Sequence, residues 1–116
     1  MDDKTTTVAE LKQLVADFVA ERDWQQFHDP KNLSMSIAIE AAELMEHFQW
    51  VRSEELDAIR REGHDHDEVA AELADVLAFA VSLANALDID IADAMQRKMV
   101  RNAEKYPAER FKGRYK

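Results

Sequence analysis

The sequence predicts an all-α protein, and three observations lead to this prediction. The 116-residue chain has only 2 Gly and 2 Pro, which is unusual for a turn-rich all-β protein. Hydrophobic residues make up 47% of it, and they recur at helical spacing over several long stretches. Strict alternation of apolar and polar residues, the mark of a half-buried strand, is absent. We expect one domain over residues 1–116, with a core at about 7–107 and a basic C-terminal tail at 108–116.

Two helices are expected in the first half of the chain. Thr7-Val-Ala-Glu10 has the pattern of a capping box, and apolar residues continue at helical spacing to about Arg22. Pro30 disfavours helix at the residue before it, so the Trp24–Pro30 segment should interrupt the pattern. A second helix should run from about Asn32, as its N-cap, to Trp50. Its inward stripe would comprise Leu33, Ile37, Glu40, Leu44, His47 and Phe48.

The second half of the chain predicts two further long helices. Ser53 could cap a short helical piece to about Arg61, and Gly63–Asp67 is the clearest loop. The third long helix should run from about Asp67 to Leu87. Asp88 or Asp90 can cap the fourth helix, which should stop before Pro107. Its inward-facing residues would be Ile91, Ala92, Met95 and Met99.

Two pairs of carboxylates stand inside the predicted core helices. Glu40-Ala-Ala-Glu43 and Glu72-Leu-Ala-Asp75 have i, i+3 spacing, which places both acids of each pair on one helix face. The segment that follows the second pair, Val76–Leu87, contains no charged residue. Four oxygen donors on two facing helices would form a site for a hard divalent cation such as Mg²⁺.

Alternative interpretations of the acids remain open from the spacing alone. A single E-x-x-E pair usually lies on a solvated face, whereas two pairs on inward stripes make a metal site and a structural charge cluster equally compatible with the pattern. A non-catalytic helical interaction module with an acidic patch is the alternative function. The Glu-x-x-His spacing of di-iron bundles is absent, which favours Mg²⁺-dependent hydrolysis over oxygen chemistry. His64, Asp65, His66 and Asp67 are better interpreted as a surface loop than as a transition-metal site.

Charge and cysteine content exclude several classes of protein. The chain has no cysteine, so disulfides, zinc ribbons and thiol nucleophiles are excluded. The net charge of −9 argues against a nucleic-acid reader, and no apolar run approaches the roughly 20 residues of a membrane span. The N-terminal residues lack a signal-peptide pattern, so a cytoplasmic protein is expected. Residues 1–95 carry a net charge of −15 and residues 96–116 a net charge of +6. This asymmetry suits an anionic, metal-bound ligand, although basic residues also favour helix C-termini.

Aromatic residues flank the first acidic pair. Indole and phenyl rings stack on nucleobases, and Trp24 and Trp50 are expected at a loop and a helix end, where they could face a cleft. Phe48 is expected in the core. The full aromatic set is Trp24, Phe27, His28, Phe48 and Trp50.

The combined motifs resemble the all-α MazG-like nucleotide pyrophosphohydrolases, and most closely their dCTP pyrophosphatase branch. The resemblance covers about residues 8–110. The segments that carry it are Trp24-x-x-Phe27-His28-x-Pro30-x-Asn32-Leu33, Glu40-Ala-Ala-Glu43-Leu44, Phe48-Gln49-Trp50, Glu72-Leu-Ala-Asp75-Val76-Leu77 and Lys98-Met99-x-x-Asn102-x-x-Lys105-Tyr106-Pro107.

This resemblance implies hydrolysis of a (deoxy)nucleoside triphosphate, with dCTP or a related pyrimidine nucleotide as substrate, to the monophosphate and pyrophosphate. Mg²⁺, with Mn²⁺ as a substitute, would be held by Glu40, Glu43, Glu72 and Asp75. Glu43 is the expected general base. The segment Trp24, Phe27 and His28, together with Trp50, would enclose the base and sugar, while Phe79 stands where the family has a tyrosine.

The resemblance extends to the last predicted helix and to assembly. Lys98, Asn102 and Lys105 share a helical face and could steady the phosphates, and Tyr106 belongs to the same substrate-binding motif. A MazG-like four-helix arrangement completed by oligomerisation is expected, as a dimer or tetramer. The apolar circumference of Val76–Leu87 independently favours a homo-oligomer.

Overall fold

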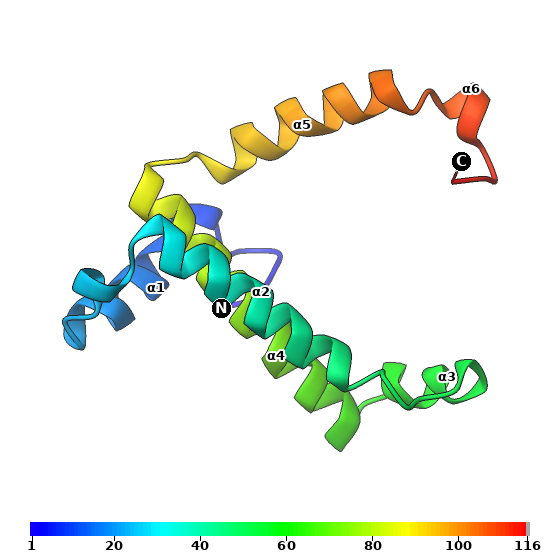
Figure 1. Ribbon diagram of the computed structural model, residues 1–116, viewed down its shortest axis with the longest axis horizontal. Helices are drawn as coiled ribbons and strands as arrows, with labels where there is room; N and C mark the ends of the chain where they lie inside the picture. Colours follow the sequence, from blue (N-terminus) through cyan, green and yellow to red (C-terminus); the bar gives the residue numbers. More distant parts are fainter. Residues whose placement is uncertain (116) are drawn as a thin grey trace.

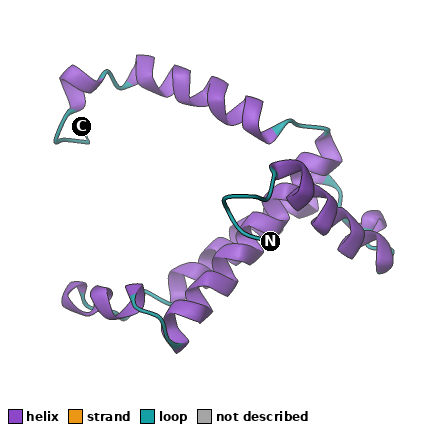
Figure 2. Ribbon diagram, turned by 180° about the vertical axis from the view of Figure 1, so that it is seen from behind, coloured by secondary structure: helices purple, strands orange, loops and turns teal. Residues whose placement is uncertain are grey.

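Six α-helices and two short 3₁₀ turns make up the computed structural model, which describes residues 1–115 (Figures 1 and 2). No strand occurs in this range, so the all-α prediction is confirmed. The elements are α1 (Val8–Glu21), η1 (Gln25–Phe27), α2 (Pro30–Glu46), η2 (Ser53–Glu55), α3 (Leu56–Arg60), α4 (His64–Leu87), α5 (Ile91–Lys105) and α6 (Ala108–Phe111).

Helix starts follow local capping chemistry. The predicted capping box of α1 is present: the Thr7 hydroxyl accepts from the Glu10 backbone N–H at 3.1 Å. The predicted N-cap of α2 is wrong, because Asp29 caps this helix and accepts from the Asn32 backbone N–H at 2.8 Å. Pro30 then occupies the first helical position, where its missing N–H costs nothing. The helix ends at Glu46, earlier than the predicted Trp50.

The predicted loop at Gly63–Asp67 is also wrong. Helix α4 begins at His64, so this histidine and the next three residues form its first turn. Residues 61–63 make the change of direction, and Gly63 has a φ of 153°, which few other residues adopt. Asp65 and Asp67 are favourable in the first turn because the helix dipole is positive there.

Three further helix boundaries agree only in part with the prediction. Ser53 caps no helix through its side chain and is instead the first residue of η2. Asp90 caps α5 and accepts from the Asp93 backbone N–H at 2.9 Å, whereas Asp88 is left-handed at the end of α4. Helix α5 stops before Pro107 as predicted, but the expected tail contains the short helix α6.

Helices α2 and α4 lie side by side and antiparallel, and α1 packs against α4 (Figure 1). The small buried core lies at these contacts. Leu33 of α2 is fully buried, and Val19 of α1 and Ala84 of α4 are buried with it. Helix α3 belongs to the connection between α2 and α4, and it lies at the end of this pair that is away from α1. The α2–α4 pair is therefore the scaffold that holds any site between these helices.

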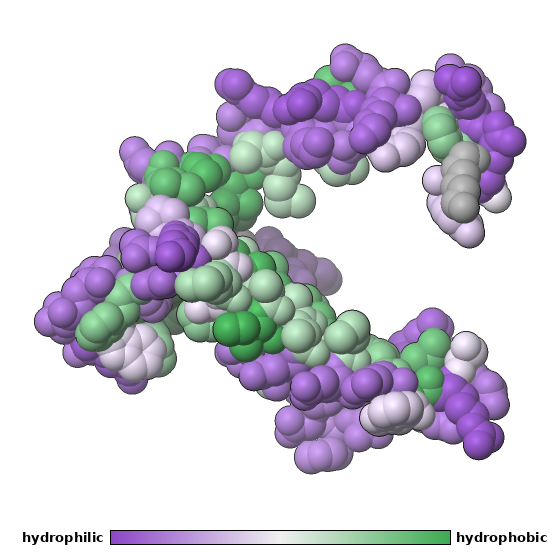
Figure 3. Space-filling view, in the orientation of Figure 1, coloured by the Kyte–Doolittle hydropathy of each residue, from purple (hydrophilic) through white to green (hydrophobic). Residues whose placement is uncertain are grey.

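Helix α5 projects away from this scaffold. The radius of gyration is 17.1 Å, whereas a compact domain of this length would have about 13 Å. Met95 and Met99 are 62% and 60% exposed, so the prediction that they face inward is wrong within a single chain. Phe48, expected in the core, is also exposed. Apolar surface gathers over the α2–α4 pair and over the end of α4 (Figure 3).

Helix α4 is the most apolar element. Its 24 residues include an 18-residue window with a mean hydropathy of 1.6, which by length and composition could cross a membrane. The expectation that no segment approaches a membrane span is therefore wrong on these criteria. The core helix of a soluble protein passes the same test, and α4 here contacts both α1 and α2.

Candidate functional site

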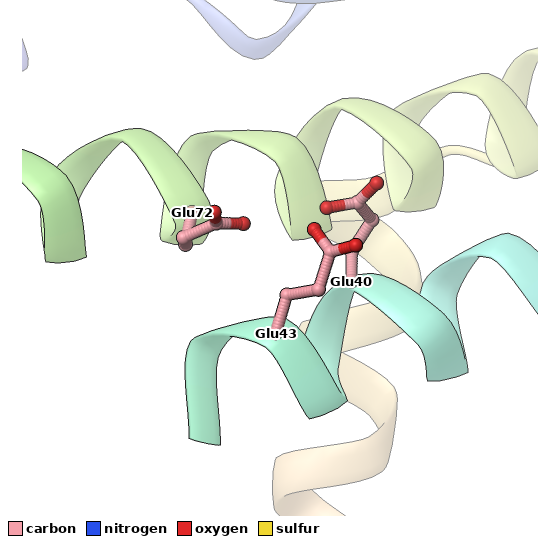
Figure 4. Close-up of side chains that lie close together, drawn as sticks. All are labelled: Glu40, Glu43 and Glu72. Carbon is pink, nitrogen blue, oxygen red and sulfur yellow. The ribbon is translucent and has the colours of Figure 1, made fainter. Parts of the chain in front are cut away.

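Three of the predicted acids gather between the two long helices. Glu40 and Glu43 project from α2 and Glu72 from α4 into the space between them (Figure 4). One carboxylate oxygen from each lies within 4.8 Å of the others, and all three residues are half-buried. The i, i+3 spacing on α2 explains why both its acids face α4. This geometry offers three oxygen ligands from two rigid elements.

The cluster has unsatisfied oxygens. Glu40 Oε2 and Glu72 Oε2 are buried and accept no hydrogen bond from residues 1–115. A buried carboxylate oxygen without a partner is costly, because it has lost its water and gained nothing in exchange. A divalent cation would satisfy both oxygens at once, and carboxylate oxygens are the ligands that Mg²⁺ prefers. The residues present therefore fit a hard metal ion.

Crowding also changes the protonation of Glu40. The pKa of Glu40 is raised to about 7, chiefly by burial, and also by a hydrogen bond with Glu43 and by the negative charges of Glu43, Asp75 and Glu72. Near neutral pH, the metal-free cluster thus retains a proton for part of the time. A cation would displace that proton.

The fourth predicted acid, Asp75, lies beside the cluster. It is exposed and is not one of the three acids within 4.8 Å, but it lines a cavity together with Glu40. His47 was expected on the inward stripe without a role at the site, and its Nε2 lies 3.8 Å from Glu72 Oε1. Its position four residues after Glu43 was the signal for this placement.

An aromatic cavity adjoins the acids. It has a volume of about 330 Å³ and is lined by Glu40, Asp75, Trp24, His28 and Phe79, among others. The His28 ring centroid lies 6.4 Å from that of Trp24 and 6.3 Å from that of Phe79. Three predicted substrate-binding residues, two flanking η1 and one from α4, are therefore brought together.

A second cavity of about 270 Å³ continues from the first. Its lining includes Gln25, from the predicted Trp24–His28 segment, and also Ser82 and Asn85, which were not among the predicted site residues. The available signal was helical spacing, because Glu72, Asp75, Phe79 and Ser82 follow one another at intervals of three and four residues. Ser82 and Asn85 are also the two polar residues of the uncharged stretch after Asp75.

The remaining predicted site residues are not brought to these cavities within one chain. Phe27 and Trp50 are 59% and 87% exposed, and neither lines a cavity described above. The α5 residues contact one another or their helix neighbours instead: Asn102 Nδ2 lies 3.7 Å from Met99 Sδ, and Lys105 Nζ lies 5.3 Å from the Tyr106 ring centroid. The predicted substrate-binding residues on or just after α5 are Lys98, Asn102, Lys105 and Tyr106.

Comparison with known proteins identifies the family of the chain. Residues 35–116 match the model of the MazG-like family. The dCTP pyrophosphatase 1 of Bos taurus is 36% identical over 107 residues, which are 92% of this chain and 63% of the relative. The Homo sapiens protein of that name is 38% identical over 102 residues, 88% of this chain and 60% of the relative. The chain thus spans less than two thirds of the length of these relatives.

A solved structure has the same fold. The crystal structure of a pyrophosphatase from Archaeoglobus fulgidus superposes with a TM-score of 0.79 at 39% identity, covering 92% of this chain and 98% of that one. The chain therefore belongs to the MazG-like family.

Proposed function

We propose that this protein hydrolyses (deoxy)nucleoside triphosphates to the monophosphate and pyrophosphate, with dCTP or a related pyrimidine nucleotide as substrate. The observation that carries the proposal is the half-buried acid cluster with two unpartnered oxygens, next to an aromatic cavity. Acids of this kind suit the metal-bound phosphates of a nucleotide, and aromatic rings suit its base. The names of the relatives support this substrate class.

Mg²⁺, or Mn²⁺ in its place, is the proposed cofactor. Glu40, Glu43 and Glu72 would hold it, and Asp75 would join them from the rim of the adjoining cavity. When bound, such an ion shields phosphate charge and lowers the pKa of a bound water. Glu43 is the proposed general base, since a carboxylate beside that water can accept its proton.

The cavity residues are proposed to bind the nucleoside. The rings of Trp24, His28 and Phe79 surround a space where a base or sugar can stack. Phe27 is the last residue of η1, the 3₁₀ turn between Trp24 and His28. Its carbonyl accepts from Asn32 Nδ2 at 3.2 Å, which links the turn to α2. Phe79 has no hydroxyl, so it contributes only an apolar face.

We further propose that the site is completed by a second copy of the chain. Helix α5 presents exposed apolar side chains, and a core with so few buried residues is small for this length. The basic residues Lys98 and Lys105 lie on this projecting helix (Figure 1), away from the acids of their own chain. In a dimer or tetramer they could reach the phosphates held by a neighbour, together with Asn102 and Tyr106, and exposed Trp50 would likewise be covered.

A nucleotide panel tests the proposed activity. The purified protein is incubated with each triphosphate and Mg²⁺, and the products are separated. Monophosphate with pyrophosphate is the expected result, greatest with dCTP and absent when the metal is chelated. Diphosphate with inorganic phosphate would contradict the proposed reaction. If folded protein forms no product from any triphosphate, a non-catalytic interaction module would be favoured instead.

A further inference from the structure

The two neighbouring cavities, together called the cleft, are lined by chemically different residues. They share three lining residues, Val19, His28 and Ser82. The end near α2 carries the acids Glu40 and Asp75, and the other end carries two side-chain amides, Gln25 and Asn85. Their volumes, about 330 and 270 Å³, are each near the lower end of the roughly 300–1,000 Å³ of small-molecule sites. The cleft therefore has room for a ligand whose two ends differ in charge.

Ser82 lies at the junction with a free hydroxyl. It is 7% exposed and is the one buried polar residue among residues 1–115. A helical serine commonly donates to the carbonyl four residues earlier, but the Ser82 hydroxyl makes no such bond within residues 1–115. Its oxygen is not one of the fully buried atoms without a partner, so it is open to the cleft and available to a ligand there.

Asn85 lies one turn further along α4 with its amide held in one orientation. Its Nδ2 donates to the Lys12 carbonyl of α1 at 3.2 Å. The Lys12 ammonium in turn donates to the Ile89 carbonyl beyond α4, which fixes α1 against this end of the helix. The Asn85 Oδ1 accepts no hydrogen bond from residues 1–115. The amide end of the cleft thus has a fixed acceptor with an open lone pair.

We propose that Asn85 is a specificity-determining residue that selects a base with an exocyclic amine, as cytosine has, and that Ser82 binds the ring carbonyl of that base. This inference rests on the proposed nucleotide hydrolysis. The phosphates would lie at the acids, and the base would extend past the rings of Trp24, His28 and Phe79 so that its polar edge reaches the amide end. Asn85 Oδ1 accepts from the exocyclic amine, and the Ser82 hydroxyl donates to the ring carbonyl that cytosine shares with uracil. Uracil and thymine present a carbonyl to Asn85, so two acceptors would face each other without a proton between them.

Paired substitutions separate base recognition from structural support. In Asn85→Ala, the preference for dCTP over dUTP, measured as the ratio of kcat/KM values, should fall by roughly tenfold, the effect of one lost hydrogen bond. Asn85→Asp also loses the donor to Lys12 but keeps an acceptor, so it should retain the preference. If both variants lose it equally, the Lys12 contact and not the acceptor governs selection, and the inference is overturned.

Ser82→Ala provides a second measurement with little risk to folding. It should lower kcat/KM by roughly 2- to 10-fold for dCTP and dUTP alike. The matched control is Ser36→Ala, a half-buried serine of α2 that lines neither cavity, and it should leave both values unchanged. A wild-type kcat/KM in Ser82→Ala would overturn the proposed contact between Ser82 and the base. Absence of turnover with every nucleotide would instead refute the proposed function, whereas turnover with unchanged preference in Asn85→Ala refutes this inference alone.

Discussion

Helix α5 and the α2–α4 pair both carry predicted site residues, but only one of these regions assembles within the chain. The acids of α2 and α4 meet between two helices in close contact. The basic residues of α5 lie on a helix that projects into solvent (Figure 1), and its apolar residues Met95, Met99 and Val100 are exposed. A site can thus be divided between a part fixed by packing in one chain and a part that association must bring to it.

Loss of one acid from the α2–α4 cluster should have the largest effect on turnover. Glu40→Gln or Asp75→Asn should lower turnover by more than the roughly 10- to 100-fold that loss of an outer-shell partner of a metal costs. The thermal midpoint should stay constant or rise, because one of several crowded negative charges is removed. Activity assays and thermal melts of the same samples check this. A sharp drop in midpoint with persistent activity per folded molecule would identify structural acids.

Substitution on α5 should test whether its exposed face is an interface. Light scattering should give a mass above the 13.3 kDa of one chain. Met99→Glu should weaken association by about 2 kcal/mol, or roughly 30-fold, because a charge would enter an apolar contact. Arg101→Gln changes the net charge by the same amount on the other side of the helix and should have little effect. A monomeric wild type at micromolar concentration would refute the interface.

Much of the assembled region could be predicted because its signals are local. The capping box at Thr7 depends on residues three apart, and the shared face of Glu40 and Glu43 depends on helical spacing alone. The amide end of the cleft could not be predicted in this way. Asn85 gains its orientation from the Lys12 carbonyl, which is distant in sequence and is brought near by packing of α1 on α4.

The wrong predictions for the start of α4 and for the inward face of α5 have physical causes. Histidine, aspartate and glycine at Gly63–Asp67 suggested a loop, but acids are stabilising in the first turn of a helix, and α4 continues through them. On α5, the apolar spacing correctly predicted a helix, but Met95 is exposed because no neighbour within the described chain covers that face. A hydrophobic pattern shows which face avoids water, and it leaves open which molecule covers it.

Removal of either tryptophan should have a smaller effect on catalysis than loss of an acid. Trp24 lines the aromatic cavity, whereas Trp50 is 87% exposed in the single chain. Removing either ring should raise KM more than it lowers kcat, since lost stacking of roughly 1–3 kcal/mol weakens ground and transition states alike. In an associated protein, a non-hydrolysable dCTP analogue with Mg²⁺ should quench both indoles. Quenching that survives Trp50→Ala in full would place only Trp24 at the base.

Acidity should change the stability of the assembled region and leave α5 unaffected. Because burial and the neighbouring carboxylates raise the pKa of Glu40 from an ordinary 4.5 to about 7, the folded metal-free protein binds more protons than the unfolded chain between these two values. Stability therefore falls as pH rises through this window. Thermal melts in chelator should show a lower midpoint at pH 8 than at pH 5.5, and Glu40→Gln should flatten this trend. Arg101→Gln, outside the cluster, should reproduce the wild-type slope. A midpoint that rises with pH in the wild type, and equally in Glu40→Gln, would show that Glu40 ionises freely and that the acids do not share a desolvated site.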